Sequence, residues 1–508
     1  MIGALLFSVG IGYFYSLPFC SVLQGCGYRI GQYFRRAKRY IFLSLLHFVL
    51  FSVPLILAQV YLKGVIKYVI CFIVYVITSV VLVFLARFMR VRVTVTNRLV
   101  RLLIGTVILD ILLCLPTYGS RLHLISAVQP ALIPVLVPLA SLILAPFEKR
   151  NNRRYIEKAS IRLLEVPNRI GITGSYGKTT VKMNLDHLLS VKYVSVATPA
   201  SFNTPLGIAR TVENMNYGAE CFIAEMGARR KGDIAELVRM VSPTVGVITG
   251  IAPQHLETFG SIEAVMREKA ELALGISDGK VYYNLANDYV RRLYQVRMGE
   301  KIGVGYRDAE AIISNVAVSL KGTTYTLTYQ GMTLELSLPL LGRAAVEDYA
   351  LAAVIALDFG VSPDDITRIG KSLPVVPHRA EVIRQGGVTI IDDSYNINPV
   401  GAAAAIDTLR SIPAKRKMIY TCGMVELGKD TIMLNRKFGG EIAEVCDIAF
   451  VQKSLYGDEV VRGIELSNRP VEIYRVSDTE QATKMFEIVV RNGDMLLLTA
   501  DLPQDYLL

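Results

Sequence analysis

A ten-residue stretch, Gly171 to Thr180, has the residue types and spacing of a loop that binds phosphate. It reads GITGSYGKTT; a short apolar run at 169–173 predicts a strand before it, and residues 178–189 follow with a helical pattern. In a strand, glycine loop and helix of this kind, backbone N–H groups and the positive end of the helix dipole face an anion. Lys178 would then reach the terminal phosphates of a nucleotide, and Thr179 would bind Mg²⁺.

Three further side chains are candidates for the same site. Glu225, in IAEMGAR, ends a predicted strand, where a parallel sheet binds ligands, and could hold Mg²⁺ beside Thr179. His255, in IAPQHLETFG, follows the next strand and is a candidate ligand, although a lone histidine is usually structural. Lys269, in REKAEL, lies on a later helix among acidic residues, where the pattern alone predicts a surface ion pair.

Alternating apolar runs and helical patterns predict the elements that position these residues. After the phosphate loop, strands are predicted at 193–197, 221–224, 245–249 and 280–284, with helices between them at about 205–215, 232–241 and 261–275. A second series begins near residue 380, with strands at 388–391, 418–422 and 448–452. This βαβ rhythm is typical of parallel sheets with helices on both faces, so we expect two α/β domains joined near Pro374–Pro377.

The first 147 residues predict a helical membrane domain. Five apolar stretches, at about 2–24, 41–61, 66–86, 102–118 and 124–147, are near the roughly 20 residues that a spanning helix needs. Basic residues follow the first, third and fifth stretches. The positive-inside rule therefore places the N-terminus outside and everything after residue 148 in the cytoplasm. The first stretch contains Gly10, Gly12 and Pro18, and is alternatively a re-entrant or interfacial segment.

The net charge of +11 is distributed unevenly along the 508 residues. Residues 1–154 contain 17 Lys and Arg but only two acidic residues, Asp110 and Glu148, whereas the remainder holds 38 basic and 42 acidic residues. Because the basic excess coincides with apolar stretches, it indicates membrane topology and not a nucleic-acid surface. With 52% hydrophobic residues and a mean hydropathy of +0.40, the chain is too apolar for a purely soluble protein.

Two features inside the predicted membrane domain are candidates for function. Pro130, Pro134 and Pro138 repeat every four residues, so they would share one face of a kinked helix and free carbonyl groups. Asp110 is an acid at membrane depth, which is unfavourable unless it is paired or hydrated. Structural kinks and a helix-packing contact are the plainer explanations. The seven cysteines, at 20, 26, 72, 114, 221, 422 and 446, show no metal-ligand spacing and are expected to be reduced.

A series of motifs between about residues 165 and 450 resembles a known family. Their order is GSYGKTT, SFNTPLG, EMGAR, PQHLETFGS, EKAEL, GRAAVEDYALAA, HRAEV, DDSYNINP and GMVELG. This order is similar to that of the Mur ligases, which join amino acids or peptides to carboxylates using ATP. It is most similar to the branch that adds D-alanyl-D-alanine to a muramoyl tripeptide. The loop TGSYGKTT, with Ile172 where the longer motif has its first glycine, is the short form typical of the family.

The resemblance implies a domain organisation and cofactors. After a membrane domain at residues 1–147 with about five transmembrane helices, it implies a P-loop-type central domain at 148–376 and a Rossmann-like C-terminal domain at 377–508. The implied cofactors are ATP and Mg²⁺. The residues implied to bind the nucleotide are Gly174, Ser175, Gly177, Lys178, Thr179, Thr180, Asn203, Arg379 and Asp393.

The resemblance also implies roles in the reaction. The implied catalytic residues are Lys178, His255, Lys269 and Arg379. The implied metal ligands are Thr179, Glu225 and His255. Lys269 matches the family's carbamoylated lysine, whose carbamate supports the metal site. The residues implied to lie near ATP or the incoming amine are Tyr395, Asn396 and Asn398.

Such a ligase would work by phosphoryl transfer. A carboxylate attacks the γ-phosphate of ATP to form an acyl phosphate, and an amine then displaces phosphate. This chemistry depends on positioning and cations more than on a covalent nucleophile. An amine bound on a mobile last domain would keep water from the acyl phosphate.

The chain departs from the family pattern in three places. The family's G-R-H-N-x-x-N motif, on the adenine side of the site, reads GRAAVED at residues 342–348. The last residues read MLLLTADLPQDYLL, where the D-alanyl-D-alanine-adding enzymes usually carry a K-G-S-type segment. Apolar stretches stand where the family has the domain that grips the uridine nucleotide. Adenine recognition, the choice of amine and the handle of the acceptor are therefore open at this point.

We therefore expect a membrane-anchored, ATP- and Mg²⁺-dependent amide ligase of cell-envelope synthesis. Its expected partners are the bilayer of the cytoplasmic membrane, a cell-envelope precursor, and an amino acid or dipeptide, with no nucleic acid. Two hypotheses for the helices stay open: they hold a lipid-linked acceptor, or they only tether the ligase, and a UDP-linked acceptor is also compatible. The alternatives in other classes are a poly-γ-glutamate-synthase-like ligase, a non-catalytic membrane scaffold and an ATP-driven exporter.

Overall fold

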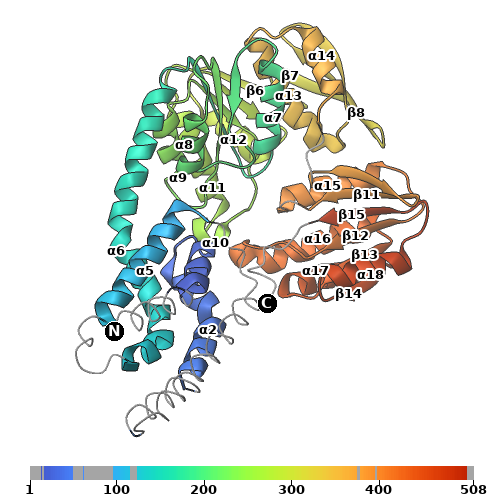
Figure 1. Cartoon of the computed structure of the whole chain (residues 1–508). Helices are drawn as coiled ribbons and strands as arrows, with labels where there is room; N and C mark the ends of the chain where they lie inside the picture. The colour runs from blue at the N-terminus through green and yellow to red at the C-terminus, as the bar shows by residue number, and fades with distance from the viewer. Residues whose placement is uncertain are drawn as a thin grey trace. The chain divides into compact units, whose positions relative to one another are not determined.

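The computed structural model describes residues 16–49, 95–114, 123–374, 378–394 and 397–499, together with Tyr13 and Tyr61. The chain falls into two compact units, Met1–Arg154 and Tyr155–Leu508 (Figure 1). Residues 16–25 of the first unit are helical. They are followed by α2 (Ile30–His47), α5 (Asn97–Cys114) and α6 (His123–Leu163), which extends past the boundary at residue 154.

One helix in the described part of the chain is long and apolar enough to cross a membrane. It covers Ala131–Leu163, within α6, and meets this criterion by length and composition alone. The predicted stretch 102–118 overlaps α5, whose 18 residues include two arginines and the buried Asp110. The stretch 66–86 and most of 2–24 and 41–61 lie outside the described residues. The described residues therefore provide one candidate span, and the five-helix membrane domain stays a prediction.

Two polar contacts connect the helices of the first unit. The ring of Pro138 removes the N–H that would bond the carbonyl of Pro134 in a regular helix. The hydroxyl of Tyr33, in α2, donates to that carbonyl at 2.8 Å, so the predicted freeing of a carbonyl group is confirmed here. The guanidinium of Arg101, in α5, donates to both carboxylate oxygens of Glu148, in α6, at 2.6 and 3.0 Å.

The second unit contains two sheets, green to yellow and orange to red in Figure 1. The first has nine strands in the order β2-β3-β1-β4-β5-β6-β7-β8-β9. Pairing is parallel from β2 to β7 in this order, and β8 and β9 add by antiparallel pairing. The strands are β1 (Asn168–Thr173), β2 (Ser195–Ala197), β3 (Cys221–Met226), β4 (Val245–Ile248), β5 (Val281–Asn284), β6 (Lys301–Gly305), β7 (Ala311–Ser319), β8 (Gly322–Tyr329) and β9 (Met332–Leu338).

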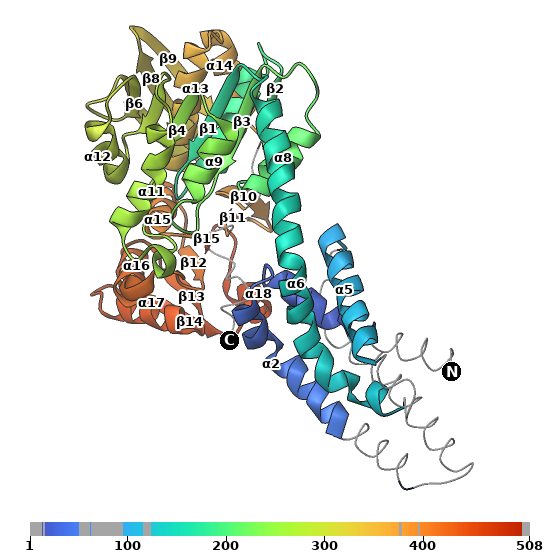
Figure 2. The ribbon, with the colours of Figure 1, turned by 90° about the vertical axis from the view of Figure 1, so that its left-hand side faces the viewer.

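Helices cover both faces of this sheet (Figure 2). The core on one face includes α7, α13 and α14, and the core on the other includes α8, α9, α11 and α12. Successive residues of the fully buried strand β3 alternate between the two cores, because neighbouring side chains in a strand point to opposite faces. The helices are α7 (Lys178–Leu189), α8 (Pro205–Glu213), α9 (Asp233–Val241), α10 (Leu256–Phe259), α11 (Ile262–Leu274), α12 (Asp288–Val296), α13 (Gly342–Asp358) and α14 (Pro363–Lys371).

The second sheet has six strands in the order β10-β11-β15-β12-β13-β14. All its pairs are parallel except β10 with β11. Helices α15, α16 and α17 pack on one face and α18 on the other. The elements are β10 (Glu381–Gln385), β11 (Val388–Asp393), α15 (Pro399–Ser411), β12 (Lys417–Thr421), η3 (Gly428–Asp430), α16 (Thr431–Val445), β13 (Ile448–Gln452), α17 (Leu455–Glu465), β14 (Glu472–Val476), α18 (Thr479–Val489) and β15 (Met495–Thr499).

The predicted βαβ rhythm is confirmed in both sheets. The helix predicted at 178–189 and the strand predicted at 448–452 have the bounds of α7 and β13. The prediction missed the antiparallel strands β7, β8 and β9. The turn between β8 and β9 is made by Gln330 and Gly331, which both have positive φ, 48° and 77°, as a tight hairpin turn of type I′ requires.

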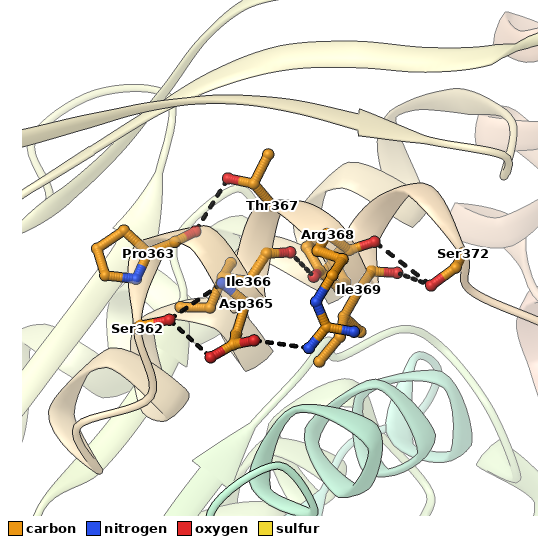
Figure 3. Close-up of polar contacts among 9 residues, drawn as sticks. Ser362, Pro363, Asp365, Ile366, Thr367, Arg368, Ile369 and Ser372 are labelled. Atoms are coloured by element: carbon orange, nitrogen blue, oxygen red, sulfur yellow. Dashed lines mark hydrogen bonds and ion pairs between the residues drawn. The ribbon is translucent and has the colours of Figure 1, made fainter.

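The short helix α14 shows how local sequence sets the ends of a helix (Figure 3). The hydroxyl of Ser362 accepts a hydrogen bond from the backbone N–H of Asp365 at 3.1 Å, and Pro363 occupies the first helical position. The carboxylate of Asp365 accepts from Arg368, one turn later, at 2.6 Å. At the other end, the hydroxyl of Ser372 donates to two carbonyls of the last turn at 3.3 Å.

Residues 375–377, at the predicted domain junction, lie outside the described part.

Candidate functional site

Residues 174–177 connect β1 to α7 and form the predicted phosphate loop. The loop is tied to the segment that follows β4. The backbone N–H of Ser175 donates to the carbonyl of Gly250 at 2.6 Å, and its hydroxyl donates to the carbonyl of Ala252 at 3.2 Å. The loop therefore has a fixed backbone at the carboxyl edge of the sheet, where the N-terminus of α7 can meet an anion.

Two positions of the loop must be glycine, because neighbouring atoms lie where a Cβ would be. A Cβ at Gly174 would lie 2.2 Å from the hydroxyl oxygen of Thr249. Gly177 has a φ of 79°, and a Cβ there would lie 2.6 Å from a carboxylate oxygen of Asp348 in α13. A side chain at either position would displace the loop.

The side chain of Lys178 folds back over this loop. Its ammonium donates to the carbonyls of Gly174 at 2.9 Å and Ser175 at 3.4 Å. Burial lowers the pKa of Lys178, and the nearby carboxylate of Glu225 acts in the opposite direction. The structure thus holds a cation against the loop that is predicted to bind phosphates.

Glu225 lies at the centre of the site. Because β3 is the parallel neighbour of β1, Glu225 ends its strand beside the beginning of α7. Its Oε2 accepts a hydrogen bond from the hydroxyl of Thr179 at 2.9 Å, and its Oε1 accepts from the amide of Asn203 at 3.1 Å. Three residues predicted from separate motifs are therefore in direct contact.

Lys182 completes this cluster, and the sequence analysis did not identify it. Its ammonium lies 3.1 Å from Oε2 of Glu225, and both side chains are 2% exposed. Burial alone would raise the pKa of Glu225, but Lys182, Lys178 and the Thr179 hydroxyl together lower it. The available signal was the spacing of four between Lys178 and Lys182, which places both on one face of a helix.

The oxygen atoms in this cluster fit a magnesium ion. Mg²⁺ binds hard oxygen ligands and usually combines one or two protein groups with substrate phosphates and water. The hydroxyl of Thr179 and the carboxylate of Glu225 are such groups, and they lie beside the phosphate loop at hydrogen-bonding distance from each other. The residues present therefore suit the metal that the chemistry needs.

Lys269, in α11, is a buried cation. It is 3% exposed, and its ammonium forms no hydrogen bond or ion pair with any residue that the structure describes. The adjacent Glu268 bonds instead to the backbone N–H groups of Gly232 and Ile234, each at 2.8 Å. Burial, reinforced by Lys178, lowers the pKa of Lys269 to about 7. The surface ion pair suggested by the pattern alone is therefore wrong.

His255 is held by a residue of the C-terminal domain. Its backbone is in the left-handed region, with a φ of 54°. Its Nδ1 contacts the carboxylate of Glu426, and the backbone N–H of Leu256 donates to the carbonyl of Glu426 at 2.9 Å. With Nδ1 engaged by a carboxylate, Nε2 is the ring nitrogen left for a ligand. Glu426 lies in the GMVELG motif, but the sequence analysis assigned it no individual role.

Two of the predicted residues of the C-terminal domain lie near the site. The guanidinium of Arg379 donates to the hydroxyl of Thr179 at 3.4 Å. The carboxyl of Asp393 accepts from the backbone N–H of Ala380 at 3.2 Å. Burial raises the pKa of Asp393 to about 6, although Ala380 and Arg379 act in the opposite direction.

The predicted amine-side residues are placed differently. Asn398 is 4% exposed, and its side chain caps α15 by accepting from the backbone N–H groups of Val400 and Gly401 at 3.1 and 3.0 Å. Tyr395 and Asn396 lie outside the described residues. The side chain of Asn398 thus stabilises a helix end in this structure.

His378 lies next to Arg379 and between two carboxylates. Glu381 and Asp392 are directly opposite each other in the antiparallel pair β10–β11, where like charges are destabilising. Nδ1 of His378 lies 2.8 Å from Oδ2 of Asp392, and its backbone N–H donates to Glu381 at 3.2 Å. The ligand atoms of the three side chains lie within 4.8 Å of one another, so a charged imidazole or a metal ion there would offset the repulsion.

The residues that replace the adenine-side motif lie at the start of α13. The carboxyl of Glu347 accepts from Asn284 and from the hydroxyl of Tyr306, each at 3.2 Å, and burial raises its pKa. Burial raises the pKa of Asp348 well above its usual range, while Thr180 acts in the opposite direction. This part of the site therefore presents two carboxyl groups beside the phosphate loop.

Two family models match the second unit. The model of the Mur ligase middle domain matches residues 172–357, and the model of the Mur ligase glutamate ligase domain matches residues 378–502. Together they cover both sheets, apart from residues 168–171 of β1, and all the site residues described above.

Individual proteins match over the same region. The UDP-N-acetylmuramoyl-tripeptide–D-alanyl-D-alanine ligase of Bacillus subtilis is 30% identical over 338 residues, which cover 65% of this chain and 72% of that protein. The crystal structure of MurF ligase from Thermotoga maritima in complex with ADP matches with a TM-score of 0.61 and 25% identity, covering 69% of this chain and 80% of that one. MurF from Acinetobacter baumannii shares the fold, with a TM-score of 0.63 at 21% identity over 69% of this chain and 77% of that one.

The burial of Lys269 makes stability depend on pH in a defined direction. In the unfolded chain this lysine stays charged up to its ordinary pKa, whereas the folded protein releases the proton near pH 7. The unfavourable contribution of Lys269 is therefore largest at pH 7 and below, and it shrinks as the pH rises toward 10. Lys269→Met should raise the melting temperature by a few degrees at pH 7, given that about 1 kcal/mol corresponds to roughly 2–4 °C.

The measurement is thermal unfolding in bicarbonate-free buffer at pH 7 and pH 9.5. The increase in melting temperature caused by Lys269→Met should be clearly smaller at pH 9.5 than at pH 7. Lys437→Met, at a lysine whose side chain is 72% exposed, is the matched control and should change the melting temperature little at either pH. An equal gain at both values would contradict the burial of a titrating amine at position 269.

Proposed function

Because the chain belongs to the Mur ligase family and is an ATP- and Mg²⁺-dependent ligase that forms amide bonds, we propose that it acts in peptidoglycan precursor synthesis. It would join an acceptor carboxylate to an amino acid or a dipeptide such as D-alanyl-D-alanine. The observation that carries this proposal is the buried contact of Thr179, Asn203 and Lys182 with Glu225 beside the phosphate loop. The similarity to the UDP-N-acetylmuramoyl-tripeptide–D-alanyl-D-alanine ligase of Bacillus subtilis supports the choice of substrates.

The reaction would proceed in two steps. The acceptor carboxylate attacks the γ-phosphate of ATP, which releases ADP and gives an acyl phosphate. The amine then attacks the acyl carbon, and inorganic phosphate leaves as the amide forms. Neither step needs a covalent nucleophile from the protein, which fits a site built from cations and hydrogen-bond donors.

Each residue of the site would have a role that follows from where it lies. Lys178 and the backbone N–H groups of the loop would hold the triphosphate, and Arg379 would add a cation from the C-terminal domain. Thr179 and Glu225 would hold Mg²⁺, which when bound neutralises charge between the carboxylate and the triphosphate. His255, oriented by Glu426, would offer Nε2 to a second metal.

Lys269 would act as a carbamate in this scheme. A neutral amine can add to carbon dioxide and lose a proton, which turns a buried cation into an anion. The burial of Lys269 and its lack of a partner among the described residues favour the neutral amine. The resulting carbamate would support the second metal, a role that a free ammonium could not have.

The first unit would place this reaction at the cytoplasmic membrane, with the ligase unit in the cytoplasm. On α5, Val100, Ile104, Ile108 and Leu112 are spaced by four residues and are 40–55% exposed. On α6, Val135, Leu139, Ile143 and Phe147 have the same spacing and are 43–58% exposed. Apolar helix faces of this kind fit a lipid bilayer. The acceptor would be a muramoyl peptide on a lipid carrier, which the membrane brings to the enzyme.

Removal of the loop lysine tests the phosphate loop. Lys178→Ala should lower the rate of amide formation by about 10²-fold or more, because the loop loses the cation that would meet the terminal phosphates. Product formation from ATP, acceptor and amine would be followed by mass spectrometry. Lys437→Ala, at an exposed lysine, is the control, and full ligation by Lys178→Ala would refute the assignment.

Chemical rescue tests the carbamate. Lys269→Ala should be inactive, and short carboxylic acids such as acetate or propionate should restore part of the activity, since they can occupy the vacated space with a carboxylate. Lys178→Ala is the control and should not respond to the same acids. Normal activity of Lys269→Ala without added acid would show that the side chain has no such role.

A choice of acceptors tests the part played by the membrane. Phosphate release from ATP would be measured with the detergent-purified full chain, D-alanyl-D-alanine or single amino acids, and either an undecaprenyl-linked or a UDP-linked muramoyl peptide. We expect release at least about tenfold faster with the lipid-linked acceptor. Equal or faster turnover with the UDP-linked form would reduce the helices to an anchor. No release with any pair would contradict the proposed ligase reaction.

A further inference from the structure

Lys182 shares the carboxylate that would bind the metal. Its side chain is 2% exposed, and its ammonium lies 3.1 Å from Oε2 of Glu225 while it also donates to the carbonyl of Ala200. Oε2 accepts in addition from Thr179 at 2.9 Å, and Oε1 accepts from Asn203 at 3.1 Å. Two protein donors thus occupy both lone pairs of Oε2, and a divalent cation that bound to this oxygen would have to displace one of them.

The charges around Glu225 make Lys182 a strong competitor. Lys178 and Lys182 both act on the charge of Glu225, and Arg379 donates to the neighbouring hydroxyl of Thr179 at 3.4 Å, so the cluster contains three cations. Besides Glu225, the carboxylate that acts on Lys182 is that of Asp186, which accepts a hydrogen bond from a serine hydroxyl at 2.6 Å. A divalent cation that entered alone would increase this excess of positive charge, whereas a triphosphate would neutralise it.

We propose that Lys182 competes with the divalent metal for Glu225, so that the metal binds to Thr179 and Glu225 only together with the triphosphate. This inference rests on the proposed function, which makes those two residues metal ligands. When Glu225 turns to the metal, the carbonyl of Ala200 remains as an acceptor for the Lys182 ammonium. Lys182 is therefore a positioning residue that sets the order in which nucleotide and metal bind.

The test measures the binding of Mn²⁺ to the full-length protein without nucleotide, from the loss of the free-ion signal in electron paramagnetic resonance. The wild type and Lys182→Arg should bind Mn²⁺ weakly. Lys182→Met should bind it about tenfold more tightly or better, since a charge at this distance shifts a neighbouring equilibrium by about one pK unit or more. Glu225→Gln added to Lys182→Met should abolish the gain, which separates this site from others such as His378 with its carboxylates.

A second variant distinguishes an effect on Mn²⁺ binding from a loss of folded structure. Lys182→Gln keeps a hydrogen-bond donor but no charge, and it should also tighten Mn²⁺ binding; thermal unfolding would show which variants are folded. Unchanged Mn²⁺ binding in folded Lys182→Met and Lys182→Gln would overturn the proposal. Tight binding of Mn²⁺ by the wild type without nucleotide would overturn it as well.

A separate measurement tests the metal ligands themselves. The affinity for a fluorescent, non-hydrolysable ATP analogue should increase when Mn²⁺ is added to the wild type, and Glu225→Gln should lose this increase. If Glu225→Gln keeps the full increase, the assignment of the metal site under the proposed function fails. If Glu225→Gln loses it while the Lys182 variants behave as wild type, only the role of Lys182 fails.

Discussion

The buried carboxylate of Glu225 is the constraint on which the rest of the site depends. A charge at 1% exposure is strongly unfavourable unless several donors surround it. Its donors come from α7 and from the segment before α8, and the parallel pairing of β1 with β3 places Glu225 opposite Ile172, just before the phosphate loop. This charge is therefore satisfied only when the sheet has the correct register and the glycine loop and the beginning of α7 are in place. The contacts that assemble the site are thus the same contacts that hold this part of the fold together.

The C-terminal domain adds charge to both sides of this centre. Arg379 brings a cation to the hydroxyl of Thr179, and Glu426 brings a carboxylate to the ring of His255. In each contact, one residue lies in a segment that connects strands of the first sheet, and the other lies in a segment that precedes or follows a strand of the second sheet. Glu426 and His255 both have a positive φ, of 61° and 54°. A site divided in this way is complete only when the two domains meet. That suits a reaction whose acyl phosphate must be kept from water until the amine arrives.

The sequence predicted the parts of this site that depend on local pattern. The phosphate loop, the bounds of α7 and the placement of Thr179 near Glu225 follow from glycine spacing, periodicity and the shared edge of parallel strands. Lys182 was missed because its partner is 43 residues away; the spacing of four from Lys178 places it on the same face of α7 but does not indicate that it is buried. The local pattern alone predicted a surface ion pair for Lys269 because of its acidic neighbours, but Glu268 is occupied by backbone N–H groups. Such partners are chosen by tertiary packing, which a local pattern does not contain.

The proposed membrane location of the first unit sets a different constraint, because polar groups inside a bilayer must be satisfied without water. Tyr33 donates to the carbonyl that Pro138 leaves free, and Arg101 pairs with Glu148 through both carboxylate oxygens. In water such contacts add little stability, but in a bilayer each unsatisfied group would be costly, so their presence beside exposed apolar faces favours a lipid environment. Under the proposed membrane location, a ligase unit attached to these helices would work at a membrane surface. An acceptor on a lipid carrier is confined to that surface, which raises its effective concentration at the site, while a soluble acceptor gains nothing from it.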